Sequence, residues 1–175
     1  MFSVVKSCGP DGDYQDLVIA LKELPDGEAL VLKKGGVYSF TEPLTFRRTI
    51  VLQPETEESI TITAPLIKFD APPKIFMVMN LINFVGKVEV TGGSTVTFDR
   101  CSFTCPSESN AIITVTDSSP NIRMCHFHDF PGYGLEYLNS KGGILTDCVF
   151  EKIGKDSFVK IGAAKPYHSN NKVQQ

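Results

Sequence analysis

Two histidines are the side chains of this 175-residue sequence best suited to act together in chemistry. His126 and His128 are two residues apart, and on a β-strand such residues point to the same side. A pair of imidazoles can bind a metal ion, but only His168, Asp129 or Glu151 could supply a third ligand. We therefore expect an exposed histidine pair, with no metal site and no cofactor.

The cysteines are the other reactive side chains, and their odd number and irregular spacing match no zinc-binding pattern. A free cysteine packs like a small hydrophobic residue, so buried free thiols are the expected state. The alternative is the disulfide framework of a secreted protein. The five residues are Cys8, Cys101, Cys105, Cys125 and Cys148.

Charge and composition argue against two classes of partner. The formal net charge is -3, whereas nucleic-acid-binding proteins usually have a basic face. The amino terminus does not resemble a signal peptide. The longest apolar run, residues 75–85, is interrupted by Asn80 and Asn83 and is too short to span a bilayer. The sequence thus predicts a cytoplasmic protein that binds neither nucleic acid nor membrane.

One helix and many short strands are expected. A helix is predicted over residues 13–24, with Asp13 as its N-cap and Pro25-Asp26-Gly27 as its stop. Its apolar residues recur at helical spacing, and they are Leu17, Ala20, Leu21 and Leu24. After Gly27, most apolar runs are three to five residues long and are bounded by turn-forming residues. Such a series is typical of a β-sandwich, a β-barrel or a solenoid.

An internal repeat favours the solenoid. The pattern Cys-x-Phe recurs at spacings of 24 and 23 residues, at positions 101–103, 125–127 and 148–150. A second apolar run keeps step with it, at positions 88–90, 113–115, 135–137 and 158–161. A period of this length suits one coil of a β-solenoid, in which each coil buries its apolar side by stacking on its neighbours. The alternative is an antiparallel sandwich in which the matches arise by chance.

Stacked coils would place equivalent side chains in ladders along the solenoid. Strand alternation turns the repeated Cys and Phe inward and the residue between them outward. One exposed ladder is expected to contain Ser102, His126 and Val149. The next is expected to contain Arg100, Met124 and Asp147. The apolar residue three positions before each Cys breaks the alternation, so we expect a bend in the chain there.

The chain resembles the pectate-lyase-like right-handed parallel β-helix superfamily over about half of its length. The matching features near the amino terminus are the helical residues 17–24, the strand 30–32, Gly36-Val37-Tyr38 and the strand 50–52. Those in the second half are Pro120-Asn121-Ile122, Cys125-His126-Phe127, Gly142-Gly143-Ile144, Asp147-Cys148-Val149-Phe150 and the strand 158–161. The cysteine-rich repeats are most similar to intracellular eukaryotic members, such as β-helix F-box proteins and SHC-binding spindle proteins.

The resemblance implies an all-β fold, a right-handed parallel β-helix solenoid of about six coils. We expect one domain over residues 1–162, with the 13–24 helix capping the first coil against edge-to-edge aggregation. Residues 163–175 are expected to be a polar C-terminal tail. The C-terminal end of the solenoid would then be open, or stacked end to end on a partner or a second copy.

The superfamily's enzymes depend on carboxylates, and their pattern is incomplete here. Polysaccharide hydrolases of this fold have adjacent aspartates, a Gly-His-Gly and an Arg-x-Lys, and the sequence contains none of these. Asp99 and Asp147 would lie about two coils, or roughly 10 Å, apart, which is far for shared calcium ligation. Asp99, Asp147 and Arg123 are the residues to consider if a lyase activity exists. We therefore expect no enzyme.

The expected function is a non-catalytic scaffold that binds another protein. Loops and faces of a rigid scaffold often carry the contacts, and the candidate surface residues are Arg100, Arg123, His126, His128, Phe130 and Tyr133. Phe130 could instead fold back onto the solenoid. The alternative function is a carbohydrate-active enzyme, a lyase or hydrolase, or a glycan binder. A third hypothesis is that the chain is part of a longer protein whose other domains carry the function.

Overall fold

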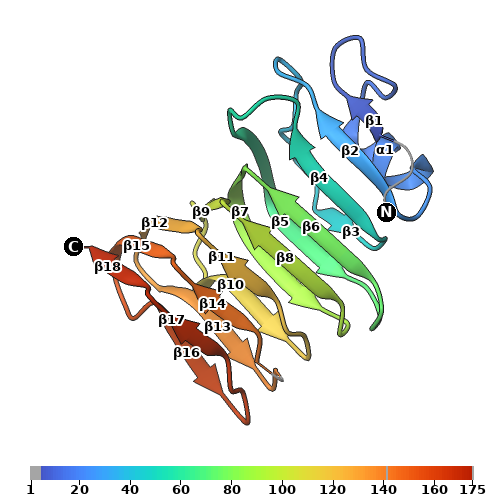
Figure 1. The fold of residues 1–175 in the computed structure, drawn as a ribbon. Coiled ribbons are helices and arrows are strands. Elements are labelled where there is room, and N and C mark those ends of the chain that lie inside the picture. Colours follow the sequence, from blue (N-terminus) through green and yellow to red (C-terminus); the bar gives the residue numbers. More distant parts are fainter. Residues whose placement is uncertain (1–4, 141, 175) are drawn as a thin grey trace.

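A computed structural model describes residues 5–140 and 142–174, which form one short helix and a series of parallel strands. The strands are divided between two sheets, and every strand pair is parallel with a partner roughly one coil away. Figure 1 shows the strands stacked from the N-terminal to the C-terminal end. The fold is a parallel β-solenoid of about seven turns, one more than the sequence predicts.

The first face of the solenoid is an eight-stranded sheet in the order β1-β2-β4-β6-β8-β11-β14-β17. Its strands are β1 (Val5–Cys8), β2 (Glu28–Leu32), β4 (Ile50–Pro54), β6 (Phe76–Asn80), β8 (Thr95–Asp99), β11 (Asn121–Arg123), β14 (Ile144–Thr146) and β17 (Tyr167–Ser169).

The remaining strands form a folded sheet with two faces, because two long strands, β5 and β7, bend and contribute to both. The second face contains the first halves of β5 (Ile60–Asp70) and β7 (Ile82–Thr91), then β9 (Ser102–Thr104), β12 (His126–Phe130), β15 (Val149–Ile153) and β18 (Lys172–Gln174). The third face contains β3 (Leu44–Phe46), the second halves of β5 and β7, then β10 (Ala111–Thr116), β13 (Tyr133–Leu138) and β16 (Phe158–Ile161).

Inward side chains form the expected ladders. Phe103, Phe127 and Phe150 are fully buried and stack with ring centroids 5.0 and 4.7 Å apart. Phe84 extends this stack by one coil, with its ring centroid 5.4 Å from that of Phe103. Aromatic stacks of this kind add to the stabilisation that comes from burial alone. The repeat is therefore confirmed as the packing unit of the core.

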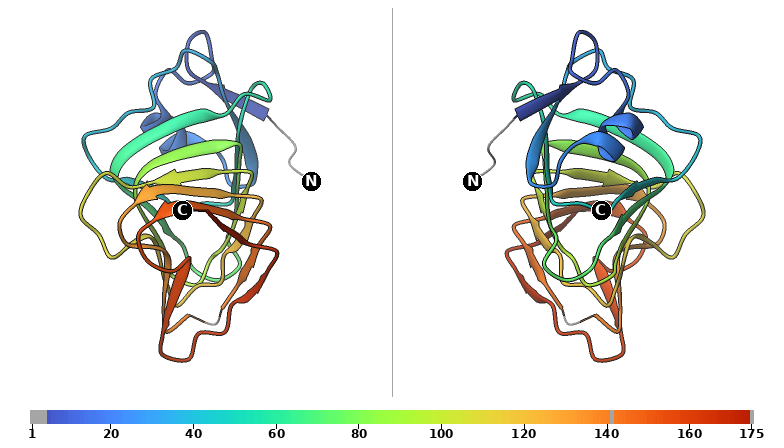
Figure 2. Two further views of the ribbon diagram at one scale, coloured as in Figure 1. Left: turned by 90° about the vertical axis from the view of Figure 1, so that its left-hand side faces the viewer. Right: turned by 90° about the vertical axis from the view of Figure 1, so that its right-hand side faces the viewer.

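Helix α1 (Leu17–Glu23) begins four residues after the expected position. Its N-cap is Asp16, whose Oδ1 accepts hydrogen bonds from the backbone N–H groups of Val18 and Ile19 at 2.6 and 3.1 Å. Asp13, the expected cap, instead accepts hydrogen bonds from the backbone N–H and hydroxyl of Ser7. The helix lies at the N-terminal end of the solenoid (Figure 2) and buries Leu17 and Ala20 there.

The expected polar tail is part of the solenoid. Within residues 163–175, β17 pairs with β14 and β18 pairs with β15, both in the register of the earlier coils. The edge strands of the preceding coil have unpaired backbone N–H and C=O groups. A polar segment can form hydrogen bonds with these groups as well as an apolar one can. The described parts of the chain, residues 5–140 and 142–174, contain no helix long and apolar enough to cross a membrane.

Candidate functional site

A repeated turn joins the first face to the second and forms a corner along the solenoid. Arg100, Met124 and Asp147 occupy equivalent positions in this turn, each with a left-handed backbone at φ between 51° and 56°. Their backbone N–H groups donate to the next coil, at the carbonyls of Arg123, Thr146 and Ser169, respectively. The ladder expected for the three residues is confirmed. So is the bend, because the residues three positions before each Cys, namely Phe98, Ile122 and Leu145, are fully buried.

The two candidate arginines share one carboxylate at this corner. Arg100 Nε lies 3.3 Å from Asp99 Oδ2, and Arg123 Nη2 lies 3.4 Å from Asp99 Oδ1. Arg100 also donates to Asn80 Oδ1 at 3.1 Å. Asp99 Oδ1 is buried and accepts no hydrogen bond with good geometry, although Arg123 stands beside it. About half of each arginine side chain is exposed, so both guanidinium groups can also contact a ligand.

The two candidate histidines lie on the second face and point outward together, as the alternation predicts. Their ring centroids are 4.9 Å apart. His126 Nε2 contacts Glu151 Oε2 at 3.1 Å. His128 contacts Asp129 through Nδ1 at 2.8 Å and the hydroxyl of Ser102 through Nε2 at 3.0 Å. Among the residues that the structure describes, no group of three or more His, Cys, Asp or Glu side chains is arranged to hold a metal ion.

The two aromatic candidates, Phe130 and Tyr133, lie in different surroundings. Phe130 is buried, so its expected role as an exposed contact is wrong, and it folds back onto the solenoid instead. A large apolar side chain gains more from burial than from exposure, and the end of β12 turns it into the core. Tyr133 lies on the third face at the start of β13, where the ammonium of Lys155 is 4.8 Å from its ring centroid.

Three further residues contact the two histidines. Ser102 lies opposite His126 in the ladder, yet it contacts His128, two residues further along β12. Asp129 and Glu151 each contact one histidine. The repeat indicates that Ser102 and the histidines lie on one face. The diagonal contact depends on side-chain conformations that the spacing does not specify.

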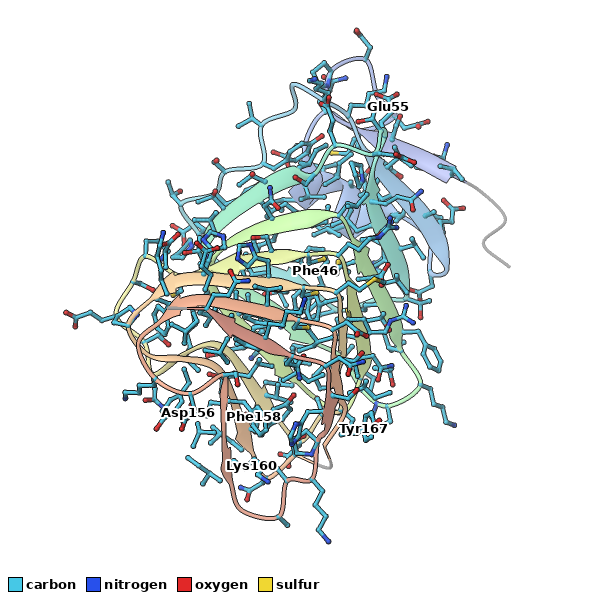
Figure 3. The ribbon with its side chains drawn as sticks, turned by 60° about the vertical axis from the view of Figure 1, so that its left-hand side comes forward. Phe46, Glu55, Asp156, Phe158, Lys160 and Tyr167 are labelled. Carbon is cyan, nitrogen blue, oxygen red and sulfur yellow. The ribbon has the colours of Figure 1, made fainter. Side chains whose placement is uncertain are left out.

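Met124 is the apolar residue that the corner exposes. Its side chain is 52% exposed, at the turn between β11 and β12. Arg123 precedes it, and His126 follows two residues later. We define the corner surface as Arg100, Arg123, Met124 and His126. An open hollow lies beside it, lined by Gln53, Glu55, Glu57, Asn80 and Arg100 among others. Figure 3 labels Glu55, which lies toward the N-terminal end.

The C-terminal end of the described chain exposes apolar side chains. Val173 continues the ladder of Phe150, yet it is 62% exposed because no further described strand covers it. Ile161 and Tyr167 are also exposed there. Figure 3 labels Phe158, Lys160 and Tyr167 at this end of the solenoid.

All five cysteines are buried free thiols, as the sequence predicts. Cys101, Cys125 and Cys148 form the inward ladder beside the phenylalanines. Burial raises the pKa of the Cys125 thiol well above its usual value and that of Cys8 to about 11. A hydrogen bond with Cys125 and burial raise the pKa of the Cys148 thiol. These thiols are buried and contribute to the packing of the core.

We expect the five thiols of the folded protein to react with Ellman's reagent at pH 8 at least about 100-fold more slowly than after unfolding, because reaction needs an accessible thiolate. The measurement is the rate of thiol release without and with guanidinium. Five equivalents should appear in the unfolded protein. A thiol that reacts rapidly in the folded protein, or fewer than five equivalents, would contradict the buried thiol ladder.

One comparison with known proteins gives a match. The family model described as "Right handed beta helix region" matches residues 78–175, which is more than half of the chain. No curated protein and no solved structure matches the chain. The matched region contains all four residues of the corner surface and the contacts of both histidines.

Proposed function

The chain belongs to the right-handed β-helix family, and we propose that it is a rigid scaffold that binds a partner protein through the corner surface. The fold alone does not determine function, because one fold can carry many activities. The proposal therefore depends on the residues of the corner. The chain resembles intracellular eukaryotic β-helix repeat proteins through its Cys-x-Phe repeats, and this resemblance supports the same function.

The observation that carries the proposal is the exposed Met124 at a corner that also carries two half-exposed arginines. Methionine and arginine are both enriched at protein interfaces. The left-handed turn residues and the backbone hydrogen bonds between coils fix the positions of Arg100 and Met124. A pre-ordered surface loses little conformational entropy on binding, which favours affinity. The partner that fits is a protein with an apolar pocket for Met124 and carboxylates that can reach Arg100 and Arg123.

The test compares two charge insertions on the first face and its corner. Met124→Asp should abolish capture of the partner from a cell extract, because it places a carboxylate in the apolar pocket and repels the partner's carboxylates. Phe76→Asp is the matched control, since Phe76 is 57% exposed on β6 outside the corner surface. The expected result is a protein that wild type and Phe76→Asp bind and Met124→Asp does not.

Two outcomes would overturn the proposal. One is that Met124→Asp captures the same proteins as wild type. The other is that wild type captures only further copies of itself, which would indicate end-to-end association through Ile161, Tyr167 and Val173 instead. Sedimentation equilibrium of the purified protein distinguishes that case, because a self-associating chain shows a mass that rises with concentration.

A glycan binder is the second candidate function, and the hollow beside the corner favours it. Carboxylate, amide and guanidinium groups from Glu55, Glu57, Asn80 and Arg100 line this hollow together. Such groups can hydrogen-bond sugar hydroxyls or pair with a uronate. Binding or cleavage of acidic and neutral polysaccharides, measured with calcium and with chelator, would favour this function over the scaffold.

A further inference from the structure

Three side chains on the outward side of the second face are hydrogen-bonded in series. Ser102 Oγ is 3.0 Å from His128 Nε2, and His128 Nδ1 is 2.8 Å from Asp129 Oδ2. This order of hydroxyl, imidazole and carboxylate is the arrangement that activates a serine for nucleophilic attack. We call the three residues the serine relay. The proposed scaffold function does not account for it.

The protons of the serine relay can be assigned from its hydrogen bonds. The hydrogen bond from His128 lowers the pKa of the Asp129 carboxyl, and the nearby charge of Lys152 lowers it further. An ionised carboxylate only accepts hydrogen bonds, so Nδ1 of His128 carries the proton that lies between them. In the neutral imidazole, Nε2 is then an acceptor, and the Ser102 hydroxyl donates to it. Nε2 is therefore placed to remove the hydroxyl proton of Ser102.

The solenoid positions the relay on rigid elements. Ser102 lies on β9 and His128 on the neighbouring strand β12, whose register pairs Ser102 with His126. Asp129, the residue after His128, has a left-handed backbone at φ 53°. Its carboxylate lies against Nδ1 of the preceding His128. Strand positions hold catalytic groups more accurately than loops do. The relay is thus built into the ladder, and both partners of the Ser102–His128 contact are held by backbone pairing.

Other charged groups also face the relay. The ring of His126 lies 4.9 Å from that of His128, and the carboxylate of Glu151 contacts His126 at 3.1 Å. Lys152 Nζ is 3.5 Å from Asp129 Oδ1 and 3.7 Å from Glu151 Oε1. Two carboxylates therefore accompany two imidazoles and one ammonium on this part of the second face.

We propose that Ser102 is an acyl-accepting nucleophile for short-chain carboxylic esters, with His128 as its general base and Asp129 as a positioning residue. Ser102 and His128 lie on an outward strand face and line none of the hollows described on the surface. The activity goes beyond the scaffold function and differs from polysaccharide-chain cleavage.

The chemistry balances with water as the second substrate. Ser102 Oγ bonds to the ester carbonyl carbon as its proton passes to His128 Nε2. The bond from that carbon to the alkoxy oxygen then breaks, and His128 returns the proton to the departing alcohol. Water repeats the sequence on the acyl-serine, which releases the carboxylic acid and restores Ser102.

The first experiment uses a fluorophosphonate probe, which labels activated serines. Ser102 Oγ would bond to phosphorus, fluoride would leave, and His128 would take the proton. Peptide mass spectrometry should place the label on Ser102. Ser102→Ala should lose it, and His128→Gln should slow labelling by about 100-fold, the usual contribution of a general base. The matched control is Ser109→Ala, because Ser109 donates only to the backbone carbonyl of Ala111 and should leave labelling unchanged.

Two further variants test Asp129, the positioning residue. Asp129→Asn should slow labelling by about 10-fold or more, because the amide no longer holds Nδ1 protonated. Asp129→Glu keeps a carboxylate and should restore part of the rate, which a purely structural role would not predict.

The proposal fails in either of two results. One is that the probe labels no serine in a protein whose circular dichroism shows an intact β-fold. The other is that 4-nitrophenyl acetate is hydrolysed at the same rate by wild type, Ser102→Ala and His128→Gln, which would indicate unspecific surface chemistry. Both results would leave the corner-binding proposal standing, because its readout is partner capture and not labelling.

Discussion

Replacing Gly86 with alanine is expected to lower the free energy of unfolding by about 3 kcal/mol or more. Gly86 lies in the middle of β7, where this strand passes from the second face to the third. Its φ is +139°, and a Cβ at this position would overlap the carbonyl oxygen of Ala64. Ala64 and Pro65 stand opposite Gly86 as an extra residue in β5, where the register shifts. The bulge and the glycine together let the sheet bend between its second and third faces.

Urea denaturation followed by circular dichroism measures this effect, and Gly35→Ala is the matched control. Gly35 also has a positive φ, at +81°, but a Cβ there would meet no atom within 4 Å. We expect the control to lose only about 1 kcal/mol, the usual cost of a left-handed backbone without glycine. Equal losses in the two variants would show that the approach of Ala64 does not matter.

Phe127→Ala is expected to destabilise the protein by about 3–5 kcal/mol. The ring of Phe127 is fully buried between those of Phe103 and Phe150, with interplanar angles of 17° and 8°. Truncation removes the transfer energy of the ring and breaks the stack at its centre. The strands above and below are fixed by backbone pairing, so they cannot close the cavity that remains.

Phe76→Ala is the control for this substitution, because it removes the same atoms from a side chain that is 57% exposed. We expect a change within about 0.5 kcal/mol for it. Thermal unfolding and urea denaturation of the three proteins give the comparison. A loss below about 1 kcal/mol in Phe127→Ala would mean that the phenylalanine ladder does not carry the stability of the second face.

The repeat made much of this fold predictable, because its signals are local. Cys-x-Phe at a spacing of one coil places Cys125 and Phe127 inward through strand alternation alone. The same alternation predicts that His126 and His128 point outward together. The bend before each Cys also follows from the sequence, since a buried Ile122 three positions earlier cannot belong to the same alternation.

Other features were decided by contacts between coils. Asp13 is hydrogen-bonded to Ser7 of β1 and therefore cannot cap the helix. Asp16 serves as the N-cap instead. The segment from 163 onward looks polar by itself, yet the edge of the preceding coil supplies hydrogen-bond partners for β17 and β18. Composition describes a segment alone, whereas strand pairing depends on the neighbour that is available.

The candidate site shows the same division. The sequence by itself determined which residues share a face, because the period of the coil and the period of the strand are both carried by residue types. Only the tertiary structure decided that Ser102 contacts His128 rather than His126, that Asp99 pairs with both arginines, and that Phe130 turns inward. Side-chain rotamers and contacts between residues on different coils set these pairings, and sequence spacing does not specify them.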